Sequence, residues 1–210
     1  MRPRSDPATF AVLVYDDVEP IDVGATAGVF SMARRVLPGV TYTILAEAKG
    51  PVRLAGGLTI LADADWRSAP AYDVLLVTGG PGWRQQVGNE ALLGFLRQQP
   101  PQRLASVCTG ALILAAAGVL RGRRATTRRL ALGSEQASPQ QLLGGGEVES
   151  VVAAVVEDGG VVTGGGVALA IDTALYLIGR LYGEEARGDV ARSLEYDRAL
   201  AANRNFLGYR

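Results

Sequence analysis

Four short, mainly apolar runs constrain the fold more than any other feature of this sequence. They occupy residues 9–15, 73–77, 104–107 and 161–163. Such runs are typical of parallel strands that are covered on both faces. Each is followed by a turn and then by a segment with helical spacing. The sequence therefore predicts a single-domain α/β protein with a doubly wound, mainly parallel sheet and helices on both faces.

Further segments complete the predicted domain. Residues 41–46 read as a strand, and residues 52–54 and 58–61 as a hairpin joined by a glycine-containing turn. Residues 184–194 are predicted to form a polar helix. Residues 134–146 are rich in Gly, Gln, Ser and Pro and have weak periodicity, so we expect a surface connection within the domain.

The composition favours a small-molecule ligand over nucleic acid or a membrane. The 210 residues include 21 Lys and Arg against 21 Asp and Glu, so no excess charge draws the chain to an anionic partner. Residues 1–7 lack the apolar stretch of a signal peptide, and no run reaches about 18 apolar residues. A lone cysteine forms no intramolecular disulfide. We therefore expect a cytoplasmic protein without a membrane segment.

Histidine is absent, and Cys108 is the only cysteine. The missing histidine excludes Ser-His-Asp and Cys-His nucleophile systems and His-bound zinc. With one cysteine, a structural zinc site is not expected either, and we predict neither a metal nor an organic cofactor. Proton transfer must then use carboxylates, Tyr, Lys, Arg or water.

Three features that could take part in catalysis or binding follow predicted strands: Asp22, the turn at residues 79–82 and Cys108. Ligands of doubly wound sheets bind at the carboxyl ends of the strands, so we expect these features to converge. Asp22 is either a helix N-cap or a general acid and base whose pKa is raised beside a thiolate. The turn at residues 79–82 either presents backbone N–H groups to a developing negative charge or is a tight turn with a structural role only.

Cys108 lies where an apolar strand meets a helix, within Ser-Val-Cys-Thr-Gly. The small Gly110 allows the sharp turn of a nucleophile elbow, which holds the sulfur at the amino end of the next helix. The helix dipole and free amides there favour the thiolate. The alternative is a small, buried, inert side chain, because free cysteines are often buried.

The remaining charged and glycine-rich motifs are expected to be structural. Gly164-Gly165-Gly166 has no flanking lysine and is not a phosphate loop. Without an aromatic platform or a helix-turn-helix pair, a basic cluster does not indicate DNA binding. We expect solvated positions for its arginines and for the acidic residues after the first strand: Arg121, Arg123, Arg124, Arg128, Arg129, Asp16, Asp17 and Glu19.

These motifs resemble those of the ThiJ/PfpI superfamily, which has a class I glutamine amidotransferase-like, flavodoxin-like fold, and most of all those of its isonitrile hydratases. The resemblance rests on residues 15–22, 79–82, 106–127 and 163–166 with Ile171-Asp172. It reaches residue 196, so we assign residues 8–196 to this domain and residues 197–210 to a C-terminal tail.

The resemblance implies the roles of particular side chains. The essential Cys, the Thr after it and the Asp after the first strand match Cys108, Thr109 and Asp22, and substrate or oxyanion contacts are assigned to Gly79, Gly80, Pro81 and Gly165. Protease-like and glyoxalase-like relatives usually carry Glu at the first site, and the protease-like ones carry His after the Cys. Asp22 and Thr109 at these positions favour the hydratase branch. Arg128 stands where hydratases carry His, and residues 129–156 match poorly.

The activity that the resemblance implies is addition of water to an isonitrile through a Cys108 thioimidate, which yields an N-substituted formamide. A homodimer is expected by the same resemblance. The alternatives are a non-catalytic domain that senses a ligand or oxidation at Cys108 and, with less support, a glyoxalase or deglycase. Related domains also form the sensor half of AraC-type regulators, and we expect no DNA-binding half in a chain ending at Arg210.

Overall fold

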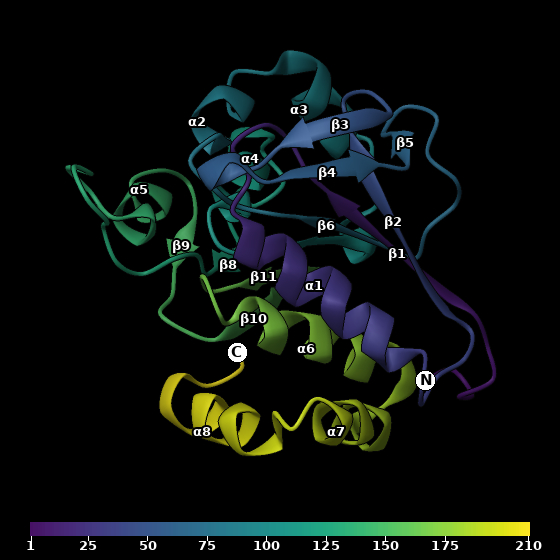
Figure 1. Cartoon of the computed structure of the whole chain (residues 1–210). Coiled ribbons are helices and arrows are strands. Elements are labelled where there is room, and N and C mark those ends of the chain that lie inside the picture. The colour runs from purple at the N-terminus through teal and green to yellow at the C-terminus, as the bar shows by residue number, and fades with distance from the viewer.

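The computed structural model describes residues 1–210 and is built around one seven-stranded sheet (Figure 1). The strand order is β10-β11-β7-β6-β1-β2-β5. Neighbouring strands run parallel except β10 and β11, which are antiparallel. The predicted doubly wound, mainly parallel α/β architecture is therefore confirmed.

Five strands of the large sheet, β1, β2, β6, β7 and β11, match strands that the sequence predicts, whereas β5 and β10 were not predicted. The strands of this sheet are β1 (Ala8–Leu13), β2 (Val40–Ala46), β5 (Ala64–Asp65), β6 (Val74–Val77), β7 (Leu104–Ser106), β10 (Val155–Asp158) and β11 (Val161–Gly164). The predicted hairpin is present as β3 (Gly50–Arg53) and β4 (Thr59–Ala62), joined through the short 3-10 helix Ala55–Gly57. A second small sheet pairs β8 (Arg124–Ala125) with β9 (Glu149–Ser150).

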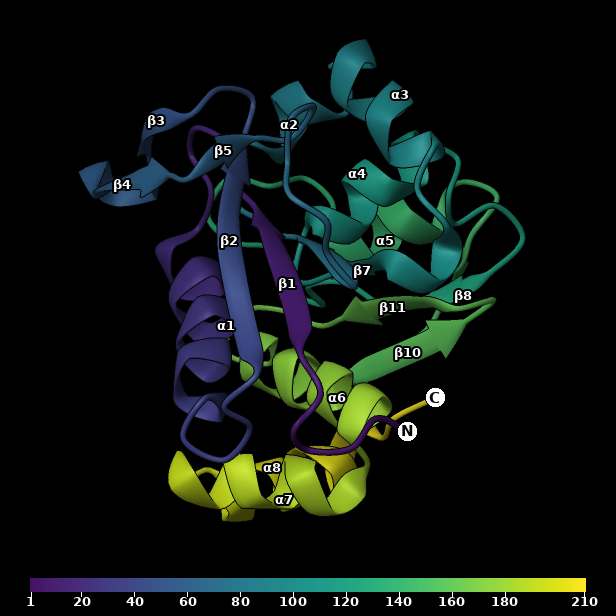
Figure 2. The same cartoon turned by 90° about the vertical axis from the view of Figure 1, so that its right-hand side faces the viewer.

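Helices cover both faces of the sheet, as Figures 1 and 2 show. One face carries α1 (Pro20–Ala33) and α6 (Ala170–Tyr182), with α7 (Glu184–Ser193) and α8 (Asp197–Leu207) outside them. The opposite face carries α4 (Gly110–Ala116), with α2 (Trp83–Gln86), α3 (Glu90–Arg97) and α5 (Pro139–Gly144) packed around it. The 3-10 helix Pro101–Arg103 precedes β7.

The core explains why the central strands are mainly apolar. All four residues of β6 are buried, as are five of the six in β1. Phe10 of β1 stacks on Phe30 of α1 with ring centroids 4.0 Å apart, which ties the sheet to its covering helix. In the sheet, β2 lies on one side of β1, and β6, which comes later in the chain, lies on the other side. The strand order therefore reverses between β1 and β6. That reversal opens a crevice at the carboxyl ends of these strands.

Two segments are more ordered than the sequence predicts. The expected surface connection at residues 134–146 contains α5, whose first turn is a capping box between Ser138 and Gln141. Six helical residues are too few to produce a visible period. The stretch assigned as a C-terminal tail forms α8, and Tyr209 then pairs with Val155 at the edge of β10.

A buried carboxylate on α6 holds this C-terminal segment. Asp172 is fully buried and accepts hydrogen bonds from the Tyr196 hydroxyl at 2.8 Å, Asn203 Nδ2 at 3.0 Å and the Tyr209 hydroxyl at 3.3 Å. The three donors come from residues before, within and after the main body of α8. Asp172 therefore joins α8 and the terminal residues to the domain.

Replacing Asp172 with Ala is expected to lower the free energy of unfolding by roughly 2–4 kcal/mol, because three donors lose a charged acceptor. Urea unfolding followed by circular dichroism measures this change. Asp6→Ala is the control, since the exposed Asp6 side chain has no hydrogen-bond partner. Equal, small effects of the two substitutions would contradict the anchoring role.

Candidate active site

Cys108 lies on the predicted nucleophile elbow between β7 and α4. Its backbone has φ of 51°, a left-handed conformation that is strained for a side chain of this type. The Cys108 N–H donates to the carbonyl oxygens of Gly164 and Gly165 at 3.2 and 3.1 Å, which holds the turn against β11. A Cβ at Gly110 would lie 2.2 Å from the Val77 oxygen, so the tight turn requires glycine there.

Asp22 is a buried partner of the thiol and not a helix cap. The N-cap of α1 is Glu19, and Asp22 in its first turn is completely buried. Oδ2 of Asp22 accepts the Gly79 N–H at 2.8 Å. Oδ1 has no hydrogen-bond partner of ordinary geometry, and the carboxyl interacts with the Cys108 side chain. The structure thus brings together two of the three predicted catalytic residues.

Burial controls the protonation of this pair. It raises the pKa of Asp22 to about 7, against the opposing effect of the Gly79 N–H. Burial, followed by the negative charge of Asp22, raises the pKa of Cys108 to about 12, and the Thr109 N–H only partly offsets this rise. The expectation of a thiolate is therefore wrong, because desolvation outweighs the stabilisation that the Thr109 N–H offers to a negative charge on the sulfur. Near neutral pH, Cys108 is a thiol and Asp22 titrates.

Thr109 and the glycine turn complete the immediate surroundings of the sulfur. The buried Thr109 Oγ1 accepts the Gly80 N–H at 2.9 Å. The N–H groups of Gly79 and Gly80 are thus occupied by Asp22 and Thr109, so these amides position side chains instead of facing a substrate. A Cβ at Gly80 would lie 2.2 Å from the Glu19 nitrogen, which explains why this approach needs glycine.

The sulfur lies at a cleft of about 190 Å³. Pro81, Gly80 and Thr109 line this cleft as predicted, whereas Gly79 lies behind it and Gly165 lines a neighbouring cavity. The full lining is Glu19, Gly80, Pro81, Trp83, Arg84, Cys108, Thr109, Arg128, Leu132, Glu135 and Val167. The cleft therefore combines apolar walls with charged groups, of which Glu19 and Arg128 act electrostatically on the buried Asp22.

An ion-pair network borders the cleft. Arg128 Nη2 donates to both carboxylate oxygens of Glu135 at 2.7 and 2.8 Å, and Arg84 Nη2 reaches Oε1 at 3.1 Å. The Arg128 and Glu135 side chains are only 11% and 14% exposed. The predicted solvated position is confirmed for Arg121 and Arg124 but is wrong for Arg128.

The two acidic residues that line the cleft are not predicted by the sequence. Glu135 lies in a stretch with no periodicity, and nothing in the sequence pairs it with Arg128. Glu19 was interpreted as a solvated loop charge, yet it borders the cleft. Its spacing of three from Asp22 was the available signal, since such residues share a helix face.

The fold and the site together define an α/β protein with a cysteine elbow and an acidic partner from the first helix. The family model described as "DJ-1/PfpI family" matches residues 8–180. The chain therefore belongs to the DJ-1/PfpI family, as its motifs predict.

The names of the curated relatives state different functions. An "Uncharacterized protein in cpoL 5'region" of Streptomyces lividans is 42% identical over 58% of this chain and 87% of its own length. The isonitrile hydratase of Pseudomonas putida is 34% identical over 55% of this chain and 50% of its own length. The HTH-type transcriptional regulator GbdR of Pseudomonas aeruginosa is 28% identical over 92% of this chain. The chain spans about half the length of the last two proteins.

Solved structures share the whole fold. A ThiJ/PfpI family protein from Pseudomonas syringae superimposes with a TM-score of 0.80 at 28% identity, covering 93% of this chain and 77% of that one. Drosophila melanogaster DJ-1beta gives a TM-score of 0.77 at 22% identity, covering 90% of this chain and 98% of that one. The second similarity concerns the fold alone.

Two kinds of feature, a cluster of metal ligands and a membrane-spanning helix, are absent from the structure. No three Cys, Asp or Glu side chains gather in an arrangement suited to a metal ion. None of the helices combines the length and the apolar character required to traverse a bilayer.

The raised pKa of Asp22 makes a prediction about stability. The folded protein keeps the Asp22 proton up to about pH 7, while the unfolded chain releases it near 3.8, so this carboxyl reduces stability as the pH rises through that window. In Asp22→Asn, the side-chain oxygen still accepts the Gly79 N–H without a charge. The variant should gain unfolding free energy over the wild type between about pH 4 and about pH 7, by about 4 kcal/mol at most.

Urea unfolding of both proteins across this pH range measures the difference. A difference that stays constant with pH would show that the Asp22 carboxyl titrates normally in the folded protein.

Proposed function

We propose that this protein adds water to an isonitrile, R–N≡C, and releases the N-substituted formamide. The observation that carries the proposal is the buried pair of Asp22 and Cys108, which keeps its thiol proton at neutral pH. Addition of a thiol to an isonitrile needs both a sulfur and a proton at the same carbon. A thiol beside a carboxyl that titrates near 7 supplies both.

The first step forms a covalent intermediate. The S–H bond of Cys108 breaks, and its proton passes through the Asp22 carboxyl to the terminal carbon of the isonitrile. The sulfur electron pair forms the new C–S bond, which gives the thioimidate R–N=CH–S–Cys108. Asp22 ends this step as a carboxylate, and its raised pKa suits it to giving and accepting protons near neutral pH.

Water then completes the reaction. The Asp22 carboxylate accepts a proton from water as the water oxygen adds to the thioimidate carbon, and that proton passes to the substrate nitrogen. The C–S bond breaks, the hydroxyl proton goes to sulfur, and R–NH–CHO leaves. Thr109, held by the Gly80 N–H, supplies the hydroxyl that orients the water or the substrate nitrogen in the cleft.

Similarity to the Pseudomonas putida isonitrile hydratase supports this choice within the DJ-1/PfpI family. Protonation of the thiol supports it further, because chemistry that depends on a standing thiolate is disfavoured at a cysteine whose pKa is raised to about 12. That same property counts against the redox-sensing alternative, since oxidation follows thiolate character.

A ligand sensor without turnover is the second candidate. Similarity to the regulator GbdR extends over 92% of this chain, against 55% for the isonitrile hydratase. A sensor would use the same cleft to bind a small molecule, with Cys108 as a buried wall. Absence of turnover combined with ligand-dependent stabilisation would identify it.

The hydratase proposal predicts that Cys108→Ala and Asp22→Asn each reduce formamide production from cyclohexyl isocyanide by at least about a hundredfold, the usual contribution of a positioned proton donor. Cys108→Ala removes the atom that bonds to carbon, and Asp22→Asn removes the group that carries the proton. Formamide production is followed by chromatography at neutral pH.

Glu19→Gln is the matched control, because Glu19 borders the cleft but takes no proton in the scheme. Turnover that survives Cys108→Ala would exclude the thioimidate route. Turnover absent from the wild type would favour the sensor.

A further inference from the structure

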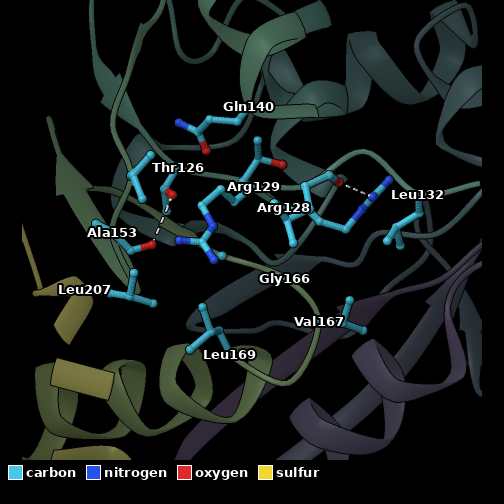
Figure 3. A pocket seen from close by; sticks show the side chains of 14 residues that line it. Thr126, Arg128, Arg129, Leu132, Gln140, Ala153, Gly166, Val167, Leu169 and Leu207 are labelled. Carbon is cyan, nitrogen blue, oxygen red and sulfur yellow. Dashed lines mark hydrogen bonds between the residues drawn. The ribbon is translucent and has the colours of Figure 1, made fainter. Parts of the chain in front are cut away.

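A second cavity of about 190 Å³ adjoins the Cys108 cleft (Figure 3). Arg128, Leu132 and Val167 line both spaces, so the two meet along these side chains. Gly166 also lines the second cavity, and a Cβ built on it would lie 2.9 Å from the Cys108 sulfur and 2.9 Å from Arg128 Cβ. Gly166 thus lies close to the sulfur and also lines this cavity.

The walls of the cavity are largely apolar. Leu130, Leu132 and Val152 are 58%, 56% and 45% exposed, and all three line it. Leu169, the N-cap residue of α6, and Leu207 of α8 also line it and lie on the same side of it in Figure 3. Exposed apolar side chains that gather around a hollow indicate a ligand site better than isolated ones do. A dry cavity of about 150 Å³ holds a benzene molecule, so this one has room for a six-membered ring.

One cation in the cavity has no partner. Arg129 forms neither a hydrogen bond nor an ion pair, and Figure 3 shows its side chain extending into the cavity towards Ala153. The neighbouring Arg128 is already engaged by Glu135 and by the Leu130 oxygen. No Asp or Glu lines the cavity. An unpaired guanidinium above apolar walls is complementary to a carboxylate on a hydrocarbon body.

We propose that this cavity binds the substituent of the substrate, and that the substituent is a hydrocarbon group bearing a carboxylate that pairs with Arg129. The inference rests on the proposed function: the isonitrile carbon lies at Cys108, and the substituent passes between Arg128 and Val167 into the cavity. The substrate class is then an isonitrile of an apolar amino acid or a similar carboxylic acid.

A binding experiment tests the cavity without requiring turnover. Cyclohexanecarboxylate and its neutral amide, cyclohexanecarboxamide, are titrated into the wild type by calorimetry. The acid is expected to bind about tenfold more tightly than the amide, the effect of one charge-assisted hydrogen bond in a partly exposed site. Arg129→Gln should remove this preference, and Arg129→Lys should retain part of it.

Arg35→Gln is the control, since Arg35 is exposed and unpaired at the end of α1, where it carries the same charge. This variant should leave the preference unchanged. Equal binding of acid and amide to the wild type, no binding of either, or an unchanged preference in Arg129→Gln would each overturn the proposal.

Kinetics then distinguish a substrate site from a separate effector site. Cyclohexanecarboxylate should inhibit turnover of methyl 2-isocyano-3-phenylpropanoate competitively, and the free acid of this compound should have a KM about tenfold below that of the ester, with the difference lost in Arg129→Gln. Noncompetitive inhibition would overturn the assignment of the cavity to the substrate. If no isonitrile is turned over, the hydratase proposal fails, and the binding experiment still decides whether the cavity selects carboxylates.

Discussion

Burial of the Asp22 carboxyl against the Cys108 thiol is the constraint on which the site depends. Burial weakens the stabilisation of charge by solvent, so both groups hold their protons more tightly than they would in water. The Gly79 N–H donates a hydrogen bond to Asp22, and the Gly80 N–H donates one to Thr109, so these two amides hold both side chains in place. The strained φ of Cys108 persists because strands on both sides of β7 fix the turn.

The sequence predicts the parts of the structure that arise from local pattern. Continuous apolar runs identify the central strands, and Gly110 after Cys108 identifies the elbow, because each signal lies within a few residues. The pKa of Cys108 could not be predicted in the same way. The direction of its shift depends on how completely distant elements exclude water, and the neighbouring Thr109 N–H, which the sequence does reveal, has the weaker effect.

Long-range pairings account for the remaining differences. In the sequence, nothing distinguishes Arg128 from the other surface arginines. In the structure, the loop before α5 places Glu135 where it accepts hydrogen bonds from Arg128. The segment assigned as a tail becomes α8 because Asp172, buried on α6, offers its oxygens to Tyr196 and Asn203. These contacts also shape the second cavity, since α8 contributes Leu207 to its wall. The poorly patterned parts of the sequence thus form part of the cavity that we propose as the site of the substituent.

The central claim is that Cys108 remains a protonated thiol beside Asp22 at neutral pH. Infrared spectroscopy tests it directly, because Cys108 is the only source of an S–H stretching band in this chain. We predict that the wild type shows this band at pH 7 and still shows it at pH 9, and that Cys108→Ala lacks it. Absence of the band from the wild type at pH 7 would show a standing thiolate and would contradict the account.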